Sequence, residues 1–181
     1  MSITTDTRQS LPVGTWVLDP VHSTIGFEVS YLSGAFRGQF REVNAGFDTG
    51  TTPVLAGSAK VANVDVKDEN LAAHLQSPDF FDAERYPELR FLAREIDLDG
   101  DTVVAPGEIT IKGITKPVEV TGTLSEPITD AWGGERLGLA LSATVDRTEF
   151  GVNWNMPLPT GDQALSNEVT IVAELQLVKA A

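Results

Sequence analysis

Apolar and polar residues alternate along much of the chain, and a period of two is typical of β-strands with one buried face. The alternation is clearest over residues 24–31. Its apolar face there consists of Ile25, Phe27, Val29 and Tyr31. This pattern predicts a strand whose odd-numbered side chains point into a core.

The phase of the alternation changes between Phe40 and Phe47, which predicts a β-bulge near residues 41–44. Further extended segments are predicted at residues 54–66, 91–98, 102–112, 118–124, 136–146 and 169–178. Asp99-Gly100-Asp101 is a hairpin signal between two of them. About eight strands in an almost helix-free chain indicate an all-β sandwich or a closed barrel.

One segment, residues 74–92 with the sequence HLQSPDFFDAERYPELRFL, interrupts the strand pattern. Ser77 and Pro78 are typical of a helix start, so a short helix is predicted from Ser77, after a helical turn over residues 71–75. Pro87 ends the segment because proline disfavours helical geometry in the residue before it. Phe80 and Phe81 are expected to cover something apolar, either as a plug on the core or as a gate over a ligand.

Composition and charge narrow the classes of partner. The 181 residues are 41% hydrophobic and 22% charged, which is ordinary for one globular domain, and the formal net charge is −13. Such a charge repels phosphate backbones, so nucleic acid is not expected as a partner. The chain has no cysteine, which excludes disulfides, thiolate nucleophiles and sulfur-ligated metals.

The two ends of the chain differ in character. Residues 1–12 read as a polar tail, and residues 13–181 as one β-barrel domain. No signal peptide and no apolar run of transmembrane length is evident. We therefore expect no integral membrane segment, and we expect the protein to reside in the cytoplasm.

Candidate catalytic chemistry rests on the only two histidines, His22 and His74. With nearby aspartates they would form a metal-dependent or hydrolytic site if the fold brought them together. The alternative is that both histidines bond locally, and we expect no catalytic residue, no metal and no cofactor. Arg147 is read as a residue that ends a strand or pairs with Glu149 on the surface.

Several motifs, in order and spacing, resemble those of the YceI family of lipocalin-like, polyisoprenoid-binding proteins. The motifs are WVLDPVHS at 16–23, GQF at 38–40, HLQSPDFFDAERYPELRF at 74–91, GEITIKGITKP at 107–117 and DRTEFG at 146–151. The resemblance runs from about Trp16 to Val178. It implies an extended eight-stranded antiparallel barrel, with one or two short helices near its mouth, that encloses a long isoprenoid or related amphiphile.

The chain departs from the family pattern just before the His-Leu pair. Relatives commonly have Arg-Asp where this chain has Leu71-Ala72, and a basic residue where it has Gln76. If those charged groups orient the charged head of a lipid in the relatives, this chain lacks the groups that would do so. A quinone, a fatty amide or another uncharged lipid is therefore favoured over a pyrophosphate, and the 74–92 segment is predicted to be a hydrophobic lid.

The leading hypothesis is a non-enzymatic lipid carrier or storage protein with an apolar tunnel. The residues expected to bind the lipid are Phe27, Val29, Phe36, Phe40, Phe47, Leu71, His74, Leu75, Phe80, Phe81, Phe91, Ile109, Ile111 and Phe150. A homodimer is left open. Two alternatives remain, namely the site at His22 and His74, and a filled structural or stress-related barrel without a ligand.

Overall fold

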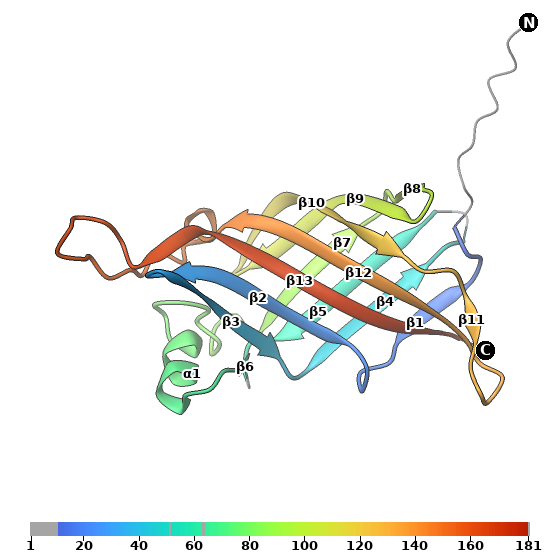
Figure 1. The fold of residues 1–181 in the computed structure, drawn as a ribbon, viewed down its shortest axis with the longest axis horizontal. Helices are drawn as coiled ribbons and strands as arrows, with labels where there is room; N and C mark the ends of the chain where they lie inside the picture. The colour runs from blue at the N-terminus through green and yellow to red at the C-terminus, as the bar shows by residue number, and fades with distance from the viewer. Residues whose placement is uncertain (1–10, 51, 63, 181) are drawn as a thin grey trace, which may run out of the picture.

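The computed structural model describes residues 11–50, 52–62 and 64–180, and its strands form a closed antiparallel barrel (Figure 1). The elements in chain order are β1 (Thr15–Leu18), β2 (Thr24–Tyr31), β3 (Gly34–Phe40), β4 (Val43–Asp48), β5 (Val54–Lys60), β6 (Val64–Asp65), α1 (Glu69–Gln76), β7 (Glu88–Ala93), β8 (Asp97–Asp99), β9 (Thr102–Ile111), β10 (Ile114–Leu124), β11 (Ile128–Thr129), β12 (Glu135–Asp146), the 3₁₀ turn η1 (Arg147–Phe150) and β13 (Leu165–Lys179).

Eight long strands make the barrel, because four of them are built from two consecutive elements each. β1 with β2, β3 with β4, β5 with β6, and β7 with β8 each follow one path, and each long strand pairs with its neighbours in the sequence. β13 closes the ring by pairing with β12 on one edge and with β1 and β2 on the other. The predicted eight-stranded barrel is confirmed, and closure leaves no long strand edge unpaired.

The predicted irregularity near residues 41–44 is present but is not a one-residue bulge. A bend at Arg41 and Glu42 ends β3 and begins β4, and the pairing changes there. β3 pairs with β2 and β6, whereas β4 pairs with β1 and β5. The change of phase in the sequence therefore marks the point where the long strand turns a corner.

The helical turn predicted over residues 71–75 is confirmed, since it lies within α1 (Glu69–Gln76). The second helix predicted from Ser77 is wrong, because residues 77–86 form turns. Asp68 is the N-cap of α1 and accepts from the backbone N–H of Leu71 at 2.9 Å. Ser77 is its C-cap, with φ −74° and ψ 167°. Pro78 explains this extended geometry, since proline disfavours helical angles in the residue before it. Ser77 donates its hydroxyl to the carbonyl of His74 at 2.6 Å instead of capping a new helix.

The interior of the barrel is divided into two hydrophobic clusters. We call the first the far-end core; its least exposed large side chains are Trp16, Phe47, Leu137 and Leu177. The second, the mouth-end core, includes Phe40, Leu75, Phe80, Ile111 and Phe150 and lies at the end of the barrel that α1 covers (Figure 1). Of the predicted tail, residues 1–10 lie outside the described residues, whereas Leu11 packs against the far-end core.

An ionic network joins two loops at the end of the barrel opposite α1 (Figure 1). The guanidinium of Arg136 donates to the carboxylate of Asp19 at 2.8 Å and to that of Asp130 at 2.7 Å. Hydrogen bonding from Arg136 holds the pKa of the Asp130 carboxyl below its usual value. The network ties the β1–β2 turn to the loop before β12, away from the mouth-end core.

Candidate functional site

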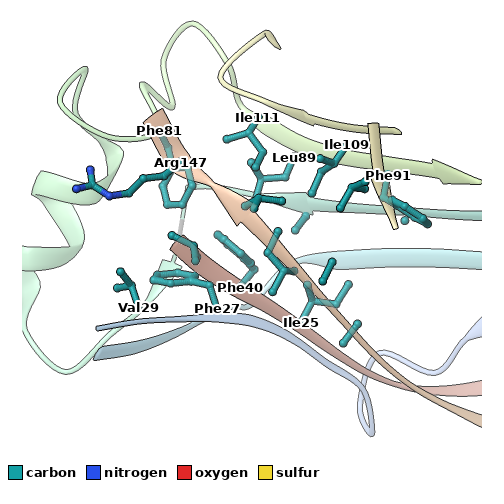
Figure 2. A pocket seen from close by; sticks show the side chains of 18 of the residues that line it. Ile25, Phe27, Val29, Phe40, Phe81, Leu89, Phe91, Ile109, Ile111 and Arg147 are labelled. Atoms are coloured by element: carbon teal, nitrogen blue, oxygen red, sulfur yellow. The ribbon is translucent and has the colours of Figure 1, made fainter. Parts of the chain in front are cut away.

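A cavity of about 400 Å³ occupies the half of the barrel next to α1. Figure 2 shows side chains from opposite walls pointing toward one another, with Ile25 and Phe27 of β2 across from Ile109 and Ile111 of β9. The wall is almost wholly apolar because alternate residues of each strand face inward. The volume falls within the usual range for small-molecule sites, roughly 300–1,000 Å³.

Most of the residues that the sequence selects line this cavity. They are Phe27, Val29, Phe36, Phe40, Leu71, His74, Leu75, Phe80, Phe81, Phe91, Ile109 and Ile111. They come from β2, β3, α1, the loop after α1, β7 and β9. The fold brings them together around one space.

Two selected residues, Phe47 and Phe150, do not line the cavity and are corrected here. Phe47 points into the barrel but lies in the far-end core at 2% exposure, where it pairs with Trp16 across the ladder. Phe150 belongs to η1, which begins after β12 has ended, and it is 1% exposed within the mouth-end core. Both side chains are packed against protein on all sides, so they serve the core and not the cavity wall.

The loop of residues 77–86, here called the mouth loop, covers the cavity together with α1. It is built of hydrogen-bonded turns that return to the helix end, such as the N–H of Phe81 to the carbonyl of Leu75 at 3.0 Å. Phe81 packs edge-on against Phe27 and Phe40, with ring centroids 6.2 and 5.8 Å away. The mouth loop therefore closes the barrel with an aromatic face directed at the cavity.

His74 and Phe80 hold the mouth loop against the long loop that follows η1. The His74 ring lies edge-on to Phe80 and to Trp154, with centroids 4.9 Å from each. Its Nε2 is also 2.9 Å from the carboxylate of Asp79. His74 therefore packs inside an aromatic cluster and has one local polar partner, which is the local role that the sequence left open for it.

The turn between β9 and β10 fastens the mouth loop from the other side. Lys112 donates its ammonium to the carbonyls of Pro78 at 2.6 Å and Gly151 at 3.2 Å. Gly113 adopts φ +75°, and a Cβ at this position would lie 2.5 Å from the ring of Tyr86. The tight approach requires glycine, and it holds the end of the mouth loop on the barrel rim.

The selection from the sequence missed the wall that β12 and β13 supply. Their contributions include Leu141, Ala143, Val145, Val169, Ile171, Ala173 and Leu175. A period of two would have identified the inward face of β12, because buried residues alternate strictly with less buried ones along this strand. Trp154 was also missed; it reaches the cavity from the loop before β13, which carries no periodic pattern.

Arg147 follows directly on the last residue of β12, as the strand-end alternative predicted. It is buried at 6% exposure and forms part of the cavity wall, so the alternative of a surface pair is wrong. Its Nε donates to the carbonyl of Ser166 at 2.9 Å, and its Nη1 donates to those of Val152 and Trp154 at 2.8 Å each. Burial lowers the pKa of the guanidinium, which nevertheless stays protonated at neutral pH. The expected pair with Glu149 does not form, because the side chain points into the protein.

The two histidines do not form a joint site. His22 lies in the turn between β1 and β2, where its Nδ1 is 2.8 Å from Asp19, whereas His74 is on α1 near the other end of the barrel (Figure 1). Within the described ranges no group of three or more histidine, cysteine, aspartate or glutamate residues is arranged to hold a metal ion. The metal-dependent or hydrolytic alternative loses its geometric basis.

Membrane insertion by a helix finds no support in the part of the chain that the structure describes. None of its helices combines the length and the apolar composition that crossing a bilayer requires.

Solved structures of low sequence identity share this fold. Burkholderia cenocepacia BcnA superimposes with a TM-score of 0.76 at 21% identity, covering 88% of this chain and 98% of that one. The Campylobacter jejuni YCEI protein gives 0.67 at 22% identity, over 80% and 85% of the two chains. A polyisoprenoid binding domain from Saccharophagus degradans gives 0.70 at 10% identity, over 93% and 100%.

Sequence comparison identifies the family in addition to the fold. A UPF0312 protein of Photorhabdus laumondii is 30% identical over 134 residues, which cover 71% of this chain and 70% of the relative. A UPF0312 protein of Pseudomonas putida is 30% identical over 140 residues, covering 72% and 71%. The family model for the YceI-like domain matches residues 16–177. The resemblance seen in the motifs is thereby confirmed, and the chain belongs to the YceI family.

Proposed function

We propose that this protein binds a long-chain isoprenoid or related amphiphilic lipid, such as a polyprenoid, a quinone or a fatty amide, in the barrel cavity. The observation that carries the proposal is the apolar cavity of about 400 Å³ beneath the mouth loop. An unfilled apolar space loses packing contacts along its wall, so a barrel without a ligand would gain stability from larger side chains. Lipid binding is also the property named for the Saccharophagus neighbour.

Desolvation of the hydrocarbon chain supplies the driving force. Each buried CH₂ contributes roughly 0.8 kcal/mol, so a tail of many carbons binds tightly after the cost of ordering it is subtracted. Catalysis is not part of the proposal, since the cavity wall holds no nucleophile paired with a base among the described residues. A carrier or storage role follows, in which the mouth loop controls entry and exit.

Organic extraction of the purified, undenatured protein followed by mass spectrometry tests the proposal. We expect about one long-chain lipid per chain, or stoichiometric uptake of an added polyprenol or quinone by protein that has been stripped of lipid. Repeated recovery of empty protein that takes up none of these lipids would leave the filled structural barrel as the better description.

Phe81→Ala is expected to speed release of a bound lipid about tenfold and to lower stability less than the loss of the more deeply buried Phe80. The ring contributes two edge-on contacts to Phe27 and Phe40, each worth about 0.5–1.5 kcal/mol, and it separates the cavity from solvent. Stopped-flow displacement of a fluorescent lipid measures the release rate, and thermal unfolding measures stability.

Phe80→Ala is the matched comparison for Phe81→Ala. Phe80 is 8% exposed and packs on His74 and Trp154, so its loss should lower the melting temperature clearly. A Phe81 variant that unfolds as easily as the Phe80 variant, with an unchanged release rate, would show that the mouth loop is a plug and not a gate.

A further inference from the structure

Arg147 is the only charged side chain in the described part of the chain that is buried on the cavity wall. Its Nη2 is inaccessible to solvent and has no hydrogen-bond partner, although Nε and Nη1 together donate to three carbonyls. Arg90 also borders the cavity, but its side chain is 72% exposed and its guanidinium donates to Glu88. One donor group of Arg147 is therefore buried without an acceptor.

The charge of Arg147 also has no carboxylate partner among the residues that the structure describes. Asp146, the adjacent acid, caps η1 and accepts from the backbone N–H and the hydroxyl of Thr148 at 2.9 and 2.6 Å. Its carboxylate acts on Arg147 only through space. A buried cation without a counter-ion, and with an unsatisfied N–H group, is costly unless something else supplies the negative charge.

The position of the guanidinium matches the place where the head of a lipid would lie. Figure 2 shows the Arg147 side chain extending toward α1, at the covered end of the cavity and away from Ile25 and Phe91. A tail that fills the apolar part of the barrel leaves its polar end near α1 and η1. Nη2 has no accessible surface in this structure, so a head group at this end reaches it only when a neighbouring side chain shifts. The donor itself is already oriented by three carbonyls and loses little freedom on binding.

We propose that the bound lipid carries a single carboxylate and that Nη2 of Arg147 donates a charge-assisted hydrogen bond to it. This inference rests on the proposed function; within the class of amphiphilic lipids it replaces the uncharged head favoured by the sequence with an acidic one. One guanidinium neutralises one negative charge, which fits a carboxylate better than a pyrophosphate. Lys112, another cation at this end, already donates to the carbonyls of Pro78 and Gly151.

The test compares two ligands that differ only in the head, geranylgeranoic acid and geranylgeraniol, on the delipidated full chain at low salt. We expect the acid to bind about tenfold to a hundredfold more tightly, the effect of one charge-assisted hydrogen bond. Equal affinity, or tighter binding of the alcohol, overturns the carboxylate proposal while lipid binding itself stands. If neither ligand binds, the proposed function fails instead.

Arg147→Gln separates recognition of the head from stability of the loop. In this variant we expect the ratio of the affinities for the acid and for the alcohol to fall to about one, and this ratio is the readout because the affinity for the alcohol reports any general effect on the cavity. Because this variant is at risk of misfolding, NMR of the ¹³C-labelled carboxyl on the unmodified protein provides an independent measurement. The bound acid should titrate at a lower pH than the free acid, since the guanidinium favours its ionised form. Titration at or above the pH of the free acid overturns the proposal.

Discussion

Ala143→Phe is expected to weaken the binding of a long-chain lipid by about a hundredfold or more. Ala143 lies on the cavity wall between Leu141 and Val145 of β12, and it is buried at 8% exposure. A benzyl group at this position would fill space that a tail otherwise occupies. Displacing roughly four CH₂ groups removes roughly 3 kcal/mol of desolvation, which corresponds to about two orders of magnitude in affinity.

Ala143 belongs both to the far-end core and to the cavity wall, so the added ring has the cavity to enter and should cost less stability than the same change deeper in that core. Ala140→Phe is the control: it makes the same change on the same strand, but Ala140 faces outward and is exposed. Displacement of a fluorescent fatty acid gives the affinities. Full binding by the Ala143 variant would mean that the lipid lies somewhere other than in this cavity.

Phe47→Ala is expected to lower the free energy of unfolding by about 3–5 kcal/mol while lipid affinity changes little. Phe47 is 2% exposed beneath the cavity, and its removal leaves a void in the far-end core next to Trp16. For a chain of this length such a loss lowers the melting temperature by about 10 °C. Urea titration and thermal unfolding measure the effect on stability.

Phe36→Ala is the paired comparison, with the opposite outcome. Phe36 lines the cavity and is only half-buried, so its removal should cost less than about 1.5 kcal/mol in stability. It takes apolar contacts away from the ligand, and we expect a loss of affinity of about tenfold. Phenylalanines at 36 and 47 that proved alike in both measurements would contradict the division of the interior into a cavity and a solid core.

The strands could be predicted because each has one face toward the interior and one toward solvent, so their sequence alternates. The hairpin at Asp99-Gly100-Asp101 could be predicted because Gly100 adopts φ +63°, a conformation that glycine favours. The helix predicted from Ser77 does not form, because a serine followed by proline is compatible with two structures. This pair can begin a helix or end one. Because Asp68 caps the N-terminus of α1, the helix begins earlier and ends at Ser77.

The site was harder to predict than the fold, because alternation shows which side chains face inward but not how deep in the barrel they lie. Phe40 and Phe47 both face inward, and only the strand pairing places the second beside Trp16. The burial of Arg147 has a similar origin. The three carbonyls that hold its guanidinium come from the loop between η1 and β13 and from the start of β13. No local sequence pattern predicts these contacts.

The far-end core gives the cavity a floor. Ala45, Leu55 and Leu141 belong both to the cavity wall and to the far-end core, so the space ends where that core begins. Among the described residues this core stands between the cavity and the far end of the barrel, so we expect a lipid that enters from the mouth to leave head first by the same route. The affinity then depends on the length of the tail. Each added carbon strengthens binding until the tail reaches the floor of the cavity, and further carbons remain outside in water.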